Sequence, residues 1–169
     1  DQIADDDPRF EYGMPPSNNA NYAFIQHMIH HLNETGMAAT VMANGAMSVQ
    51  NNSAQIREKI IEADLLDAVI ALPKALFYTT SIPACILILS KGKQEDKYRD
   101  RKEETLFNDA TDLFETVNRT QNRLTKDNIE KISNTVRKYR GELDENYADK
   151  DGFCSVADID EISNNRYII

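Results

Sequence analysis

Apolar and polar residues alternate with a helical period near the start of the chain and then give way to a continuous apolar run. Between Asn19 and Gly36, apolar side chains recur at the spacing of one helix face, which predicts a helix over residues 20–33. Residues 37–43 are almost all apolar. Because a short run of this kind is typical of a strand buried on both faces of a sheet, we expect a buried strand after the helix.

The same two patterns then repeat. A second amphipathic helix is predicted from Ser53 onward, with Arg57-Glu58-Lys59 on its solvent side. Residues 65–72 form a second apolar run, which Pro73 ends. A third apolar run, at 82–89, follows after only about ten residues, too few for a helical crossover. We therefore expect the third strand to lie antiparallel to its neighbour.

This order of elements indicates an α/β protein. It resembles the second half of a doubly wound sheet, with three strands of which the last is antiparallel, while the first half lies outside the sequence. Residues 1–93 are interpreted as half of one α/β domain. Residues 94–169 are interpreted as a linker and a mostly helical C-terminal extension, with an edge strand at 105–107, a helix over 128–140 and a short helix between 158 and 169.

The charge of the chain has the wrong sign for a protein that neutralises DNA phosphates alone. The chain carries 28 acidic and 19 basic residues, a net charge of -9. Lys and Arg side chains gather in residues 91–102, but acidic residues are interleaved with them. This segment either contacts phosphates or, as we favour, is a solvated loop. A role with nucleic acid therefore requires basic surface from another protein.

Three further features bear on location and completeness. No apolar run approaches the ~18 residues of a membrane span. Residues 1–7 contain neither an initiator Met nor a signal sequence, which indicates an internal cut. Cys85 and Cys154 make neither a metal-binding spacing nor a disulfide framework. We expect a cytoplasmic protein with no membrane contact.

Four stretches of the sequence carry a family resemblance. They are DDPRFEYGMPP at 6–16, NANYAFIQHM at 19–28, ANG at 43–45 and LPKALFYTTSIP at 72–83, followed by shorter matches at Asn118-Arg119-Thr120, Leu124-Thr125 and Gly152-Phe153-Cys154. In order and spacing these stretches resemble the methyltransferase subunits of type I restriction-modification systems, downstream of that family's Asn-Pro-Pro-Phe catalytic motif. The resemblance implies transfer of a methyl group from S-adenosyl-L-methionine to N6 of adenine in DNA.

Two elements of that family are absent from this sequence. The six glycines never form Gly-x-Gly, so the glycine-containing cofactor loop is missing. Pro15-Pro16 is preceded by Met14 and followed by Ser17, so it lacks both the amide acceptor and the aromatic residue of the catalytic tetrad and is interpreted as a rigid loop dipeptide. We therefore expect no catalytic residue in this fragment and no activity from the fragment alone.

An aromatic pair follows the second predicted strand. Enzymes that modify a base within a duplex flip it out and hold it by stacking, and the resemblance implies that Phe77, with Tyr78 beside it, occupies the position of the stacking aromatic. The alternative is a loop aromatic packed on the edge of the sheet. We favour stacking of the target base.

Two further groups of residues are candidates, one by the same resemblance and one by its place at the end of a strand. Asn19, Asn21 and Tyr22 open the first helix where the family approaches the cofactor, although helix capping explains the asparagines equally well. Asn44 and Gly45 follow the first strand, at the edge where doubly wound sheets bind ligands. They form either a substrate-binding edge or an ordinary turn, and the sequence leaves both readings open.

His27 and His31 are four residues apart on one helix face, the spacing of a metal-binding pair. Since no Glu completes His-Glu-x-x-His and no third ligand is near, we expect no metal site. A hydrolase is also disfavoured, because no Ser or Cys lies in a nucleophile elbow.

The resemblance also implies partners. In the intact complex these would be DNA, a specificity subunit that reads the sequence, a restriction subunit and a second methyltransferase subunit. Such a division would explain an acidic chain in a DNA enzyme. The alternative is a non-catalytic α/β protein-interaction module, in which Phe77 is merely structural.

Overall fold

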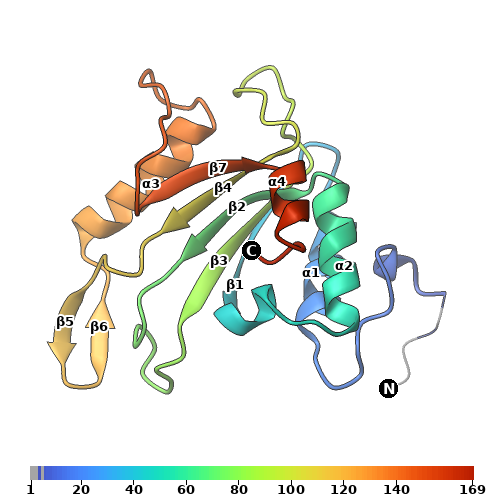
Figure 1. Cartoon of the computed structure of the whole chain (residues 1–169), viewed down its shortest axis with the longest axis horizontal. Coiled ribbons are helices and arrows are strands. Elements are labelled where there is room, and N and C mark those ends of the chain that lie inside the picture. The colour runs from blue at the N-terminus through green and yellow to red at the C-terminus, as the bar shows by residue number, and fades with distance from the viewer. Residues whose placement is uncertain (1–3, 5) are drawn as a thin grey trace.

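A five-stranded sheet lies between two layers of helices (Figure 1). The computed structural model describes residue 4 and residues 6–169. We expected an internal cut in the segment 1–7, and residues 1–3 and 5 of that segment lie outside the described residues. The strands of the sheet are β1 (Met37–Ala43), β2 (Leu66–Ala71), β3 (Ala84–Ser90), β4 (Glu104–Asp109) and β7 (Cys154–Asp158). The helices are α1 (Asn21–His31), α2 (Asn52–Glu62), α3 (Lys126–Tyr139) and α4 (Ile159–Asn164), with short 3₁₀ turns η1 (Pro8–Phe10) and η2 (Asn44–Met47).

The strand order is β1-β3-β2-β4-β7. The third strand, β3, lies between β1 and β2 and is antiparallel to both, so the predicted antiparallel pairing is confirmed. The segment 72–83 between β2 and β3 contains no helix that would carry the chain back along the sheet. Since β4 pairs parallel with β2, the carboxyl ends of β1, β2 and β4 all lie at one edge of the sheet.

The prediction of three strands was wrong, because the sheet has five. Residues 105–107 belong to β4, which lies between β2 and β7 and is not an edge strand. The segment 94–169 is therefore not mostly helical: besides α3 and α4, it contributes β4, β7 and a small hairpin of β5 (Glu115–Asn118) and β6 (Gln121–Arg123). A domain boundary after residue 93 stays a prediction, although β4 and β7 join the same sheet as β1–β3.

The sequence predicted that strand β1 is buried on both faces, and this prediction was wrong. Within the described residues it lies at one edge of the sheet, and Met37 and Val41 are half exposed, at 50% and 55%. The described residues therefore do not cover all the apolar side chains of β1.

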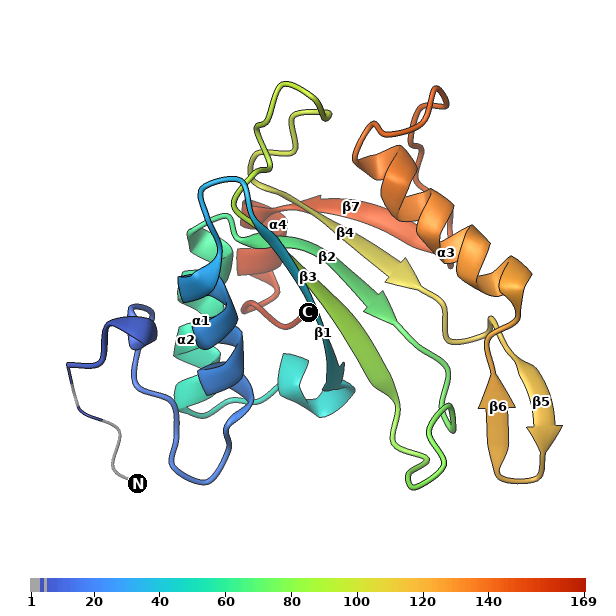
Figure 2. The same cartoon turned by 180° about the vertical axis from the view of Figure 1, so that it is seen from behind.

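The helices bury the two faces of the sheet separately (Figure 2). On one face, side chains of α1, α2 and α4, including Ile25, Ile56 and Ile162, pack against Val69 and Leu87 of the sheet. On the other face, α3 packs on the alternate strand residues, which include Ala68, Ile70 and Leu106. Successive strand residues point to opposite faces, so β2 contributes to both cores.

One prediction of solvent exposure was wrong, and a second was wrong for two residues. Arg57, expected on the wet side of α2, is 2% exposed, and its guanidinium donates hydrogen bonds to the carbonyls of Tyr167 and Val49. In the segment 91–102, Lys93 and Arg101 are buried, at 3% and 0% exposed. Carbonyl or carboxylate partners offset the cost of burying each charge, and a spacing pattern along the sequence cannot reveal those partners.

Candidate functional site

The candidate site is the edge of the sheet where β1, β2 and β4 end. Turn η2 follows β1 there, the loop 72–83 follows β2, and the β5–β6 hairpin follows β4. Open α/β sheets bind ligands outside the carboxyl ends of their parallel strands. The predicted residue pairs Asn44-Gly45 and Phe77-Tyr78 belong to two of these connections.

Backbone hydrogen bonds join these connections to one another. The Asn44 amide donates to the Pro83 carbonyl at 3.1 Å, which ties η2 to the end of the loop 72–83. The Leu72 amide donates to the Ala84 carbonyl at 2.9 Å, and the Ala110 amide donates to the Ala71 carbonyl at the same distance. The sheet thus fixes where each connection leaves the edge.

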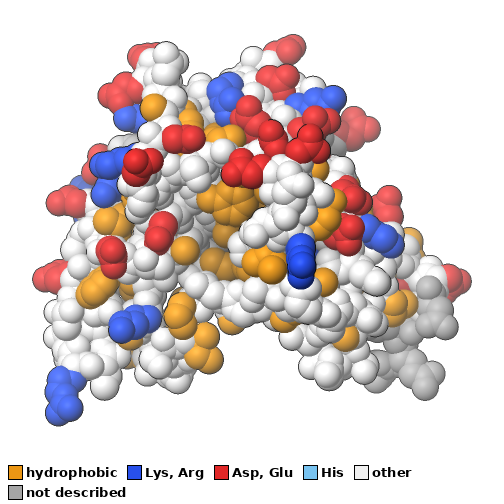
Figure 3. All heavy atoms as spheres, in the orientation of Figure 1, with side chains coloured by type: hydrophobic (Ala, Val, Ile, Leu, Met, Phe, Trp, Pro, Cys, Tyr) orange, Lys and Arg blue, Asp and Glu red, His pale blue; other side chains and the backbone are white. Residues whose placement is uncertain are grey.

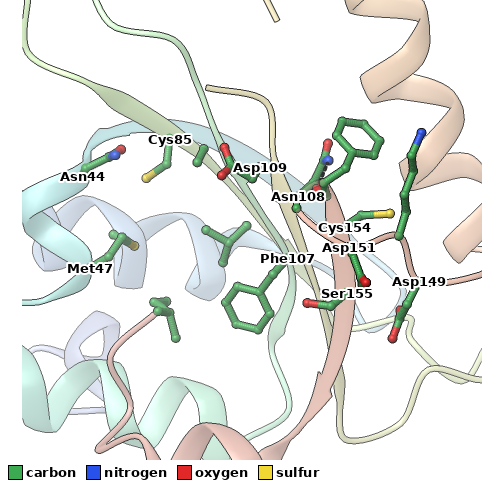
Figure 4. Close-up of a pocket in the computed structure, with 16 residues that line it drawn as sticks. Asn44, Met47, Cys85, Phe107, Asn108, Asp109, Asp149, Asp151, Cys154 and Ser155 are labelled. Atoms are coloured by element: carbon green, nitrogen blue, oxygen red, sulfur yellow. Dashed lines mark hydrogen bonds between the residues drawn. The ribbon is translucent and has the colours of Figure 1, made fainter. Parts of the chain in front are cut away.

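A cavity of about 570 Å³ opens at this edge, within the usual range of small-molecule sites (Figure 4). Figure 4 shows Asn44, Cys85 and Asp109 on one side of it and a second group of polar side chains, from residues 149–155, on the other. Met47, Val69, Cys85 and Phe107 provide apolar lining, and Asp109, Asp149 and Asp151 provide acidic groups. This lining suits a flat apolar molecule that carries hydrogen-bond donors.

Two lining side chains have distinct chemical environments. The amide oxygen of Asn44 is buried and accepts no hydrogen bond from any residue in the described part of the chain, which leaves it free to accept one from a ligand. Burial raises the pKa of the Cys85 thiol, so this thiol stays protonated and unreactive at neutral pH.

The sequence did not identify Cys85, Asp109 or the loop 149–155 as site residues. The sequence carried a signal for Asp109, because this residue ends a strand where the sheet binds ligands. That strand, however, was predicted to be the outermost strand of the sheet. Cys85 lies in an apolar run and has no distinguishing neighbour. The loop 149–155 is far from η2 along the chain, and only the pairing of β7 with β4 brings it to this edge.

Phe77 and Tyr78 lie in the loop 72–83, and neither is among the residues that line the cavity. They are 43% and 91% exposed. The Thr80 amide donates to the Phe77 carbonyl at 3.4 Å, which closes a tight turn around the pair. Phe77 is therefore only partly packed on the protein, and much of its ring is accessible.

The candidate cofactor residues are used within the chain. The Asn19 side-chain oxygen accepts a hydrogen bond from the Asn21 amide at 3.0 Å. Tyr22 is 3% exposed and its hydroxyl donates to the Ala46 carbonyl at 3.1 Å, so it links the start of α1 to η2. Burial raises the pKa of Tyr22. Asn19 and Tyr22 thus use their polar side-chain atoms within the chain, which does not fit a cofactor cradle made by these residues alone, and Tyr22 contacts the turn that holds Asn44 and Gly45.

Gly45 lies beside open space. A Cβ atom placed on it would meet no atom within 4 Å, and its φ is not in the left-handed region that favours glycine. The fold therefore does not require glycine at this position.

The histidine pair lies on the surface of α1. The His31 ring nitrogen Nδ1 is 2.8 Å from the His27 carbonyl, and both side chains are exposed. Within residue 4 and residues 6–169, no group of three or more His, Cys, Asp or Glu side chains has the arrangement of a metal site. No helix in the described part of the chain is long and apolar enough to cross a membrane.

The sequence matches the family model of the N-6 DNA methylases over residues 1–169. The chain belongs to this family. It is 43% identical over 165 residues to the methylase subunit of the type I restriction enzyme HindI from Haemophilus influenzae, an alignment that covers 97% of this chain and 35% of that subunit. It is 39% identical over 173 residues to the MjaIX methylase subunit of Methanocaldococcus jannaschii, with 99% of this chain and 30% of the relative covered. The N-6 DNA methylase chain described here thus spans about a third of the length of these relatives.

The fold agrees with a solved structure of the same class. The type I restriction-modification methyltransferase subunit from Streptococcus thermophilus superimposes with a TM-score of 0.81 at 32% identity, over 96% of this chain and 32% of that one. The predicted resemblance to type I methyltransferase subunits is confirmed, and the mixed α/β fold of this N-6 DNA methylase is that of its structural relative.

Proposed function

We propose that this chain is the part of an N6-adenine DNA methyltransferase, working in a type I restriction-modification complex, that forms the target-base side of the active site. The observation that carries the proposal is the family match over the whole chain, together with the loops of Asn44 and Phe77 at the ligand-binding edge of the sheet. The sheet would then be the second half of the doubly wound catalytic domain.

In this proposal Phe77 stacks on the flipped adenine. A base that leaves the duplex loses its stacking partners and needs a flat apolar surface in return. The half-exposed ring of Phe77 offers such a surface, with Tyr78 beside it. Asn44 and Gly45 line the substrate edge, where the unpartnered amide oxygen of Asn44 can accept a hydrogen bond.

The methyl group would come from S-adenosyl-L-methionine, the donor used by this class of enzyme. The residues of this chain do not by themselves fit that cofactor. Asn19, Asn21 and Tyr22 would at most support a cofactor pocket formed mainly by residues outside this chain. We accordingly propose that the chain alone transfers no methyl group.

The same proposal assigns DNA recognition to partners. With a net charge of -9, this chain as a whole repels phosphates. A specificity subunit would supply the basic surface that reads the sequence, and a restriction subunit and a second methyltransferase subunit would complete the complex.

The test uses the full-length methyltransferase in its native complex. Phe77→Ala and Phe77→Leu should lower methyl transfer and the fluorescence gain of 2-aminopurine at the target position about tenfold, since aromatic–base stacking is worth about 1–3 kcal/mol. Phe77→Tyr keeps the ring and should keep both signals. Unchanged base flipping and turnover in Phe77→Ala would show that Phe77 only packs against the protein and does not hold the target base.

One observation favours the alternative of a non-catalytic interaction module. Strand β1 lies at an edge of the described sheet and exposes Met37 and Val41, and such an edge can pair with another polypeptide. Methyl transfer by the full-length protein separates the two functions, because an interaction module would have none.

A further inference from the structure

The β5–β6 hairpin is fastened to the loop that carries Phe77. The amide of Asn122 in β6 donates to the Ala75 carbonyl at 2.9 Å, and its side-chain amide donates to the Lys74 carbonyl at 3.1 Å. Asn122 is 9% exposed, so water competes little for these bonds. The hairpin and the loop therefore form one unit at the carboxyl edge of the sheet (Figures 1 and 2).

Two further contacts restrict this unit. Leu76 of the loop and Leu124, next to β6, pack against the same apolar cluster, which includes Ile70 and Ala110. Ala75 has a φ of 58°, in the left-handed region that residues other than glycine rarely adopt. Because the Asn122 amide binds the carbonyl of this residue, the hairpin stabilises the bend that presents Phe77.

The outer surface of the unit is apolar and basic. Tyr78, Ile82 and Val117 are 91%, 60% and 50% exposed. Arg119 lies in the exposed turn between β5 and β6, and it makes no ion pair with any residue in the described ranges 4 and 6–169. Figure 3 shows a basic side chain at the tip of the hairpin and apolar side chains farther up this face, while acidic side chains gather mostly over its upper part.

We propose that the tip of the β5–β6 hairpin contacts the DNA backbone through Arg119, next to the base that Phe77 holds. This inference rests on the proposed function, because it assumes that DNA approaches the Phe77 edge. A basic side chain without an acidic partner is available to a phosphate, and an Arg guanidinium binds a phosphate with two hydrogen bonds. Arg123 is less suited to this role, because Glu115 binds it at 2.8 Å.

The hairpin thus has two roles. Asn122 positions the Phe77 loop from within, and Arg119 anchors the duplex from the tip. A phosphate contact of this kind fixes the position of DNA without reading its sequence. Arg119 should therefore matter equally for target and non-target duplexes.

The experiment measures equilibrium binding of a duplex oligonucleotide to the full-length protein in its native complex, without S-adenosyl-L-methionine, across a salt series. Arg119→Gln should weaken binding about threefold or more and lower the slope of log Kd against log salt by about one, the signature of one lost phosphate contact. Arg119→Lys keeps the charge and should retain most of the affinity. Lys59→Gln, an exposed basic position on α2, is the matched control and should change neither quantity.

Wild-type affinity and salt slope in Arg119→Gln would overturn this inference. Methyl transfer to adenine, measured separately on the wild type, tests the proposed function. If the wild type methylates and Arg119→Gln binds DNA normally, the hairpin contact fails alone. If the wild type does not methylate, the proposed function fails, and the binding data still decide whether Arg119 contacts DNA.

Discussion

The Arg101 side-chain nitrogen Nε lies 3.0 Å from Oδ1 of Asp67, and neither side chain is exposed to solvent. Asp67 belongs to β2, and Arg101 closes the loop that precedes β4. Arg140, at the end of α3, lies 3.7 Å from the other oxygen of Asp67. One buried carboxylate therefore joins the central sheet, the loop 91–102 and the third helix.

The first prediction concerns this network. Asp67→Ala leaves the buried guanidinium group of Arg101 without its carboxylate, while Arg140 keeps its pair with Glu142. The substitution should therefore lower the free energy of unfolding by about 3–5 kcal/mol. Urea unfolding followed by circular dichroism measures the change. Arg123→Ala breaks the exposed pair with Glu115 and should cost less than about 1 kcal/mol. Equal losses in the two variants would mean that the buried network contributes no more to the free energy of unfolding than an exposed ion pair.

This network illustrates which parts of the fold the sequence could not predict. Arg101 and Lys93 lie in a run of mixed charges, and local composition favours a solvated loop there. Their partners are far along the chain: Asp67 for Arg101 and Asp64 for Lys93. Strand β7 was missed for a related reason, because the segment 154–158 forms a strand only through its pairing with β4.

The parts with a local signal were predicted well. Helix α1 and strands β1–β3 have strong periodicity or continuous apolar runs, and the short connection after β2 determined the antiparallel direction of β3. The candidate site was predicted in part, because the carboxyl-edge rule requires only strand ends. It located Asn44 but not Asp109, whose strand was assigned to the periphery, and it gave no indication that the Tyr22 hydroxyl binds Ala46.

The second prediction concerns Tyr22. Tyr22→Phe removes the hydrogen bond to the Ala46 carbonyl and should lower the free energy of unfolding by about 1 kcal/mol. Chemical denaturation measures this loss. Titration of the full-length protein with S-adenosyl-L-methionine then decides the role of the residue: a fall in affinity supports a cofactor contact, and an unchanged affinity assigns Tyr22 to packing and to the position of η2.

The third prediction concerns pH. Hydrogen bonds from the Arg9 side chain and backbone lower the pKa of Asp7 from 3.8 to about 2. A lowered pKa in the folded state means that this interaction is fully present above pH 3.8 and is lost as the pH falls through 2. Carbon-detected NMR titration of the Asp7 carboxyl should give a midpoint near 2. In Arg9→Gln the midpoint should move back toward 3.8, and a midpoint that stays low would show that Arg9 is not the cause.

The fourth prediction separates fold from function at Gly45. Gly45→Ala should leave stability unchanged or raise it by up to about 1 kcal/mol, because the new methyl group meets no atom and the unfolded chain loses freedom. Gly141→Ala is the contrasting control. Gly141 has a φ of +73°, and a Cβ atom there would lie 3.0 Å from the Arg99 backbone nitrogen, so this variant should lose more than about 1 kcal/mol.

Activity is the decisive measurement for Gly45. If the open space beside Gly45 receives the substrate, the added methyl group of Gly45→Ala occupies part of it, and the full-length enzyme should methylate more slowly while its melting temperature stays the same or rises. The larger side chain of Gly45→Val should deepen the loss, since it fills more of the same space. Full activity in both variants would show that η2 is an ordinary turn, and the substrate edge would then have to be sought among Asn44, Asp109 and the residues of the cavity beside them.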